Sequence, residues 1–67
     1  MKWISVDSSR IDAVAWEDRT TYIRFKDGAI YAYSGVSEAQ HRAFMSSSSL
    51  GSALNDFQSY HPYRRIN

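Results

Sequence analysis

Hydrophobic and polar residues alternate through the middle of the chain, in two β-rich runs on either side of a short polar loop. The runs are residues 20–25 and 29–34, and residues 26–28 separate them. In the first run, apolar side chains recur at every second position, which is the period of a strand with one buried face. The pattern therefore predicts a β-hairpin at the centre of the fold.

The length of the hairpin loop decides which side chains share a face, because a shift of one residue moves every side chain to the other face. A two-residue loop would leave Tyr31 and Tyr33 exposed beside Arg24. A three-residue loop with Gly28 in the left-handed conformation moves both tyrosines to the apolar face. We favour the three-residue loop, because Asp27 followed by glycine suits that turn and the apolar side chains then gather on one face.

Two more strands are predicted before the hairpin. Residues 3–6 alternate in polarity, and residues 11–17 combine β-branched, aromatic and alanine residues. An alanine-rich helix is the alternative for 11–17, but the β-branched residues and the turn signal that follows favour a strand. Short polar side chains predict a turn at 7–10. With the hairpin, these strands form a four-stranded antiparallel meander.

Two helices are predicted after the hairpin. Ser37 and Gln40 match a capping box, which begins a helix that ends near Met45. Its expected inward positions are Ala39, Ala43 and Phe44 or Met45. A second helix begins near Ser49, and Gly51 in its first turn predicts a close backbone approach. Its apolar positions, at helical spacing, are Leu50, Ala53, Leu54 and Phe57.

The whole chain is predicted to be one α+β domain, residues 1–67, with a four-stranded antiparallel β-meander and two C-terminal helices packed on one face. Pro62 prevents the second helix from continuing. We therefore expect residues 60–67 to form an extended basic and aromatic tail.

Composition narrows the functional classes. The chain has eight Lys and Arg against seven Asp and Glu, which argues against binding of polyanions by net charge alone. Six of the eight cations are arginine, whose planar guanidinium suits phosphate binding and base stacking. No cysteine is present, and no apolar run has the length of a membrane span or a signal peptide. We expect a cytoplasmic protein with no membrane partner.

The sequence resembles the KTSC family over nearly its whole length. The residues that carry the resemblance are Val6-Asp7-Ser8-Ser9, Ile11, Trp16, Phe25, Asp27-Gly28, Tyr31, Tyr33, Val36, Ser49, Gly51, Asn55, Tyr60 and Pro62-Tyr63-Arg64-Arg65. Two positions depart from the family pattern: Ser37 replaces a common proline, and Trp16 replaces a tyrosine. KTSC domains stand alone in bacterial and phage proteins and also occur at the C-terminus of some lysyl-tRNA synthetases, so the resemblance implies RNA binding.

Arginine and tyrosine residues form the strongest candidate site. Nucleic acids need cations for phosphates and flat faces for unstacked bases, and the C-terminal stretch supplies both. The alternative is that its tyrosines pack on the domain while its arginines are solvated. The outer face of the hairpin could extend the same surface, although an ordinary solvated sheet face is the favoured explanation of its residues. The predicted nucleic-acid-binding residues are Tyr22, Arg24, Lys26, Tyr63, Arg64 and Arg65.

Other chemistry has weaker support. Ser8 and Ser9 invite comparison with a nucleophile, with His41 or His61 as the base, but no nucleophile motif surrounds them. Glu38 and His41 share a helix face without enough further ligands for a metal. We expect no catalytic residues, no metal, no cofactor and no small-molecule substrate, and hence no enzyme.

The leading function is therefore a small non-enzymatic module that binds nucleic acid, RNA in preference to DNA. The alternative is a protein-interaction or homodimerisation module that uses exposed aromatic residues and an uncovered sheet edge. Ionic strength separates the two functions, because phosphate contacts weaken steeply with salt and an aromatic interface scarcely responds.

Overall fold

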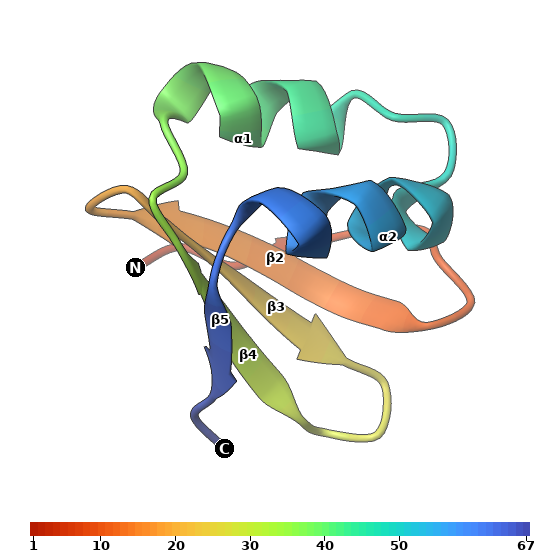
Figure 1. Cartoon of the computed structure of the whole chain (residues 1–67). Coiled ribbons are helices and arrows are strands. Elements are labelled where there is room, and N and C mark those ends of the chain that lie inside the picture. The colour runs from red at the N-terminus through yellow and green to blue at the C-terminus, as the bar shows by residue number, and fades with distance from the viewer.

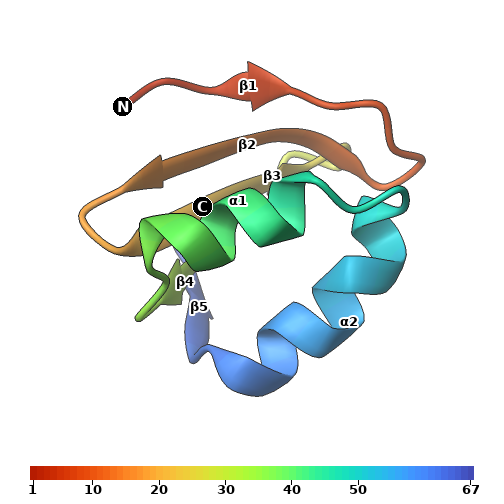
Figure 2. The same ribbon diagram turned by 90° about the horizontal axis from the view of Figure 1, so that it is seen from above.

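One antiparallel sheet and two helices make up the computed structural model, which describes residues 1–67 (Figure 1). The elements in chain order are β1 (Ile4–Ser5), β2 (Ile11–Glu17), β3 (Thr20–Phe25), β4 (Ile30–Ser34), α1 (Glu38–Met45), α2 (Leu50–Tyr60) and β5 (Tyr63–Arg65). Both helices lie on the same side of the sheet (Figure 2). The predicted α+β class and antiparallel meander are confirmed, with five strands in the order β1-β2-β3-β4-β5 instead of four.

The central hairpin has the predicted three-residue loop. The amide of Phe25 donates to the carbonyl oxygen of Ala29 at 2.8 Å, so these two residues face each other and residues 26–28 form the loop. Gly28 has a φ of 94°, and its amide donates to the carbonyl oxygen of Phe25. The Asp27 carboxylate accepts from the amide of Ala29 at 2.9 Å, which fixes the turn from inside. This register turns both tyrosines of β4 towards the helices.

The N-terminal strands follow the prediction closely. β2 has the predicted bounds, which excludes the helical alternative, and β1 is shorter than residues 3–6. Between these strands, the Ser8 hydroxyl accepts from the amides of Arg10 and Ile11, each at 3.2 Å. Asp18 and Arg19 both have positive φ, which is the conformation of a two-residue hairpin turn between β2 and β3.

Helix α1 begins at the predicted capping box but turns a different face to the core. The Ser37 hydroxyl accepts from the amide of Gln40 at 3.1 Å, and the Gln40 side chain accepts from the amide of Ser37 at 2.9 Å. Phe44 is its buried residue, whereas Ala39 and Ala43, which were expected to point inwards, are exposed. A phenyl ring removes far more apolar surface from water than a methyl group, so Phe44 sets the rotation of the helix.

Helix α2 buries the predicted apolar stripe. Its buried residues are Leu50, Leu54 and Phe57, and Ala53 is half-buried. The ring of Phe57 lies 4.6 Å from that of Phe44 and 5.5 Å from that of Tyr33, so it joins both helices to the sheet. A Cβ atom added to Gly51 would meet nothing within 4 Å, so the predicted close approach is wrong. Neither helix has the length and hydropathy needed to cross a membrane.

The C-terminal stretch is not a free tail. Tyr60 is the last residue of α2, and Tyr63–Arg65 forms β5, which pairs antiparallel with β4. Pro62 supplies an acceptor to this junction, since its carbonyl oxygen accepts from the amide of Ser34 at 2.8 Å. The stretch is extended as predicted, but it forms the edge of the sheet.

Candidate functional site

The structure separates the predicted nucleic-acid-binding residues by strand alternation. Ala32 on β4 is paired with Tyr22 on β3 and with Arg64 on β5, so these three side chains share one face. Arg24 lies two residues beyond Tyr22 and faces the same way. This face, which we call the outer face, is the one that carries no helix (Figure 1).

The outer face has small residues as its floor. Ala13, Ala15 and Ala32 are only 1%, 1% and 5% exposed, although no helix covers them. Ala15 is paired with Tyr22, and Ala13 with Arg24, so long side chains stand beside each methyl group. The half-buried side chains of Tyr22 and Arg24 therefore cover the alanines and form part of the solvent-facing layer of the outer face.

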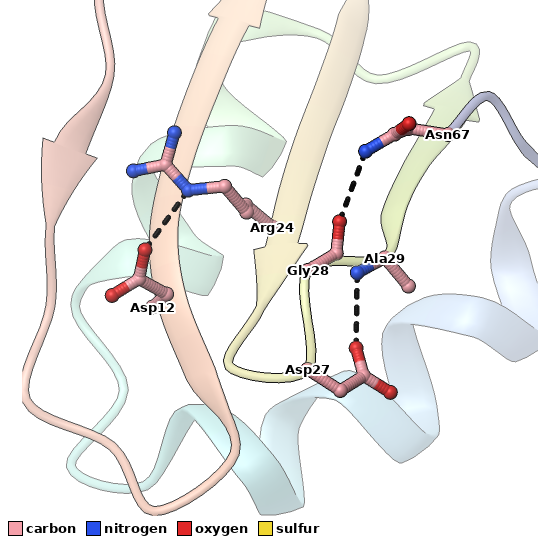
Figure 3. A network of polar contacts seen from close by, with 6 residues as sticks. All are labelled: Asp12, Arg24, Asp27, Gly28, Ala29 and Asn67. Carbon is pink, nitrogen blue, oxygen red and sulfur yellow. Dashed lines mark hydrogen bonds and ion pairs between the residues drawn. The ribbon is translucent and has the colours of Figure 1, made fainter.

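Arg24 makes two side-chain contacts on the outer face. Its Nε donates to the Asp12 carboxylate at 2.9 Å (Figure 3), and its Cζ lies 4.8 Å from the centre of the Trp3 ring. Trp3 is not among the residues predicted from the sequence to bind nucleic acid. Trp3 and Ile4 are successive residues, so their side chains point to opposite faces of the sheet. Only the pairing of β1 with β2 shows that Trp3 reaches Arg24.

Tyr63 and Arg65 lie on the other side of the sheet, which we call the helix side. Tyr63 is paired with Tyr33, and their ring centres are 5.3 Å apart. Its ring is also 5.9 Å from that of Tyr31, and the residue remains 49% exposed. The Nε of Arg65 donates to the carbonyl oxygen of Asn67 at 2.6 Å. The C-terminal cluster of the sequence is therefore divided, with Arg64 alone on the outer face.

Lys26 lies at the tip of the hairpin, apart from both groups. Its side chain is exposed, and its amide donates to the carbonyl oxygen of Arg10 at 2.9 Å. Beside it, the Asn67 side chain donates to the carbonyl oxygen of Gly28 at 3.1 Å and ties the C-terminal residue to the loop (Figure 3). The tip thus carries one solvated cation next to the start of β4.

His41, which was weighed as a base and as a metal ligand, contacts two neighbouring side chains. His41 Nδ1 is 3.0 Å from the Thr21 hydroxyl, and its ring stacks on Trp16 with centres 6.1 Å apart. Burial lowers the pKa of His41, and the nearby Glu38 carboxylate opposes that effect. No three His, Asp or Glu side chains come close enough to hold a metal ion.

A groove of about 750 Å³ runs between the two helices. Its apolar floor includes Phe44 and Phe57. His61, which is 7% exposed, packs against Phe57 with the ring centres 4.6 Å apart and the rings tilted by 48°. Asp56 also lines it, and no Lys or Arg does. The groove therefore lacks the cations that a polyanion requires.

The comparisons with known proteins agree with this architecture. The sequence profile of the KTSC domain matches residues 7–60. The crystal structure of a KTSC domain protein from Yersinia pestis superimposes with a TM-score of 0.90 at 30% identity, covering 98% of this chain and 97% of that chain. No curated protein matches with significant similarity. The chain therefore belongs to the KTSC domain family.

Proposed function

We propose that this domain binds single-stranded nucleic acid, RNA in preference to DNA, through its outer face and without catalysis. The observation that carries the proposal is the set of large side chains above the alanine floor. These residues are Trp3, Tyr22, Arg24 and Arg64. Sheet faces with exposed aromatic rings are a recurrent platform on which unstacked bases lie.

The charges of the outer face support phosphate binding. Arg64 forms no ion pair, so its guanidinium is available to a ligand. Arg24 pairs with Asp12, but the two side chains are 36% and 52% exposed, and such a pair is worth at most about 1 kcal/mol. A phosphate can therefore share or replace that contact. Binding of this kind positions a strand with little sequence discrimination.

The experiment is a fluorescence-anisotropy titration of labelled single-stranded RNA, single-stranded DNA and duplex DNA at low and near-physiological salt. We expect saturable binding, tightest for RNA, that weakens as salt rises. Each phosphate contact to a single strand contributes about 0.7 to the steepness with which log affinity falls against log salt concentration. The double variant Arg24→Ala with Arg64→Ala should therefore reduce that steepness by about 1.4.

Arg42→Ala is the matched control. Arg42 carries the same charge, is 76% exposed and lies on α1, away from the outer face. Its loss should leave RNA affinity unchanged. The proposal fails if no nucleic acid binds at low salt, or if the control variant weakens binding as much as the outer-face variants do.

The competing function is protein interaction or homodimerisation through the β1 edge of the sheet. β1 is an edge strand, and the Ile4 side chain on it is 47% exposed, so a second chain has backbone groups and apolar surface to pair with. A solution mass of two chains that persists at high salt, together with absence of RNA binding, would favour this function.

A further inference from the structure

A second cavity lies on the helix side of the sheet, between the hairpin, β5 and α2. Its volume is about 320 Å³. Four aromatic rings line it: those of Phe25, Tyr31, Tyr33 and Tyr63. The Phe25 and Tyr31 rings meet edge to face at 5.6 Å, and Tyr63 contacts both other tyrosines. The cavity is thus a small aromatic pocket separate from the outer face.

The hydroxyl of Tyr33 has no partner within the chain. The residue is 1% exposed, and its hydroxyl makes no hydrogen bond. The hydroxyl oxygen is nevertheless not fully enclosed by protein atoms. The remaining exposure must therefore belong to the hydroxyl, which reaches the cavity. Burial and the neighbouring phenols of Tyr63 and Tyr31 raise the pKa of Tyr33 to about 12, and Arg10 opposes this. Tyr33 is therefore a protonated donor at neutral pH, near the other phenols and a guanidinium.

Cationic donors outnumber acidic groups in this pocket. Arg10 and Arg65 line it, and neither forms an ion pair. Asp27 is the one acidic side chain in the lining, and one of its oxygens accepts from the amide of Ala29. Arg65 uses its Nε for a backbone contact, which leaves its terminal nitrogens free. Two guanidinium groups beside phenolic donors fit an anion with several acceptor oxygens, and phosphate has that geometry.

We propose that this pocket binds a nucleoside monophosphate, either as a free mononucleotide or as the phosphorylated end of an RNA strand. Arg10 and Arg65 hold the phosphate, and the half-exposed ring of Tyr63 offers its face to the base. The Gln58 carboxamide, also in the lining, supplies a donor and an acceptor for the base edge or ribose. The volume of this pocket is at the lower limit of the range for ligand sites. It suits one nucleotide and is too small to enclose a longer segment of nucleic acid.

The test is calorimetric titration with adenosine monophosphate, adenosine, inorganic phosphate and phenyl phosphate, with amide NMR spectra to locate the site. We expect adenosine monophosphate to bind at least about tenfold more tightly than the other three, because each lacks part of the recognised group. Amide shifts should map to Tyr31, Tyr63 and Gln58. Phenyl phosphate binding equally well would overturn recognition of the base.

An arginine outside both proposed sites provides the matched control. Arg65→Gln should weaken the binding of adenosine monophosphate by about tenfold or more, since it removes a charge-assisted contact. Arg42→Gln removes the same charge from α1, away from this pocket, and should leave that affinity unchanged. Tyr33→Phe, checked for folding by circular dichroism, should weaken binding by removing one donor. The proposal fails if nothing binds at millimolar concentration, or if Arg42→Gln and Arg65→Gln weaken binding equally.

A short RNA with and without a 5′-phosphate distinguishes the two sources. Tighter binding of the phosphorylated strand, with competition by adenosine monophosphate, would assign the pocket to a strand end. Binding of the free nucleotide without such competition would assign it to a mononucleotide. The pocket does not depend on the outer face, so failure of RNA binding there leaves this test intact.

Discussion

Replacing Gly28 and Gly51 separately by alanine should change the stability of the domain in opposite directions. Gly28 has a φ of 94°, and a Cβ atom there would meet nothing within 4 Å. The cost of Gly28→Ala is therefore backbone strain alone, about 1–2 kcal/mol for an L-residue in the left-handed region. The reduced freedom of the unfolded chain offsets about 0.4–1 kcal/mol of it. The net loss in the free energy of unfolding should be about 1 kcal/mol.

Gly51 gives the matched control because it lies in the first turn of α2 and also has no atom within 4 Å of an added Cβ. Alanine is the better helix former by up to about 1 kcal/mol, so Gly51→Ala should stabilise the domain. Gly28→Asn should cost less than Gly28→Ala, because asparagine tolerates positive φ.

Urea unfolding followed by circular dichroism measures these changes, with the free energy obtained by linear extrapolation. In a domain of this size, about 1 kcal/mol corresponds to a shift of about 4–8 °C in Tm. Unchanged stability in Gly28→Ala would show that the hairpin does not require positive φ at that position. Destabilisation by Gly51→Ala would show that the region around α2 is more crowded than described.

Two titrations give further predictions. Burial lowers the pKa of His41, so the unfolded chain binds the extra proton more readily, and stability should fall as pH drops through 6.5 towards the lowered value. Urea unfolding across this range should show a smaller pH dependence in His41→Gln, and an equal dependence in both proteins would contradict the assignment. The pKa of Tyr33 is raised to about 12 from 10.0, so stability should fall as pH rises through that interval. Ultraviolet titration should show one late phenolate in the native protein that Tyr33→Phe removes, whereas ionisation of all tyrosines near 10.0 would refute the burial of that hydroxyl.

Much of the fold could be predicted because local signals agreed. Asp27 and Gly28 suit a three-residue loop, and the same loop also gathers the apolar side chains on one face. Ser37 with Gln40 marks the start of α1 by hydrogen bonds within one turn. The orientation of α1 was predicted less well, since alanines at helical spacing are compatible with more than one buried face and the contact of Phe44 with α2 is tertiary.

β5 and the division of the candidate site depended on contacts distant in sequence. Three residues after Pro62 carry no strand signal of their own, and they become a strand by pairing with β4. Once that pairing exists, alternation sends Arg64 to one face and Arg65 to the other. Trp3, which precedes β1, meets Arg24 on β3 across β2, and Arg10 reaches the tyrosines from a turn. Clustering of arginines and tyrosines along the sequence therefore could not indicate which face of the sheet each residue would occupy.

The position of β5 has a consequence for solubility. Residues 29–34 form a run without charge, proline or glycine, which is the composition of segments that stack into fibrils. β5 occupies the hydrogen-bonding edge of that run and places Arg64 and Arg65 at the new border of the sheet, where charge discourages further strand addition. A proteolytic cut near Pro62 would bare the β4 edge while leaving the rest of the core in place. The last few residues thus cover an edge of β4 that would otherwise be open to strand addition.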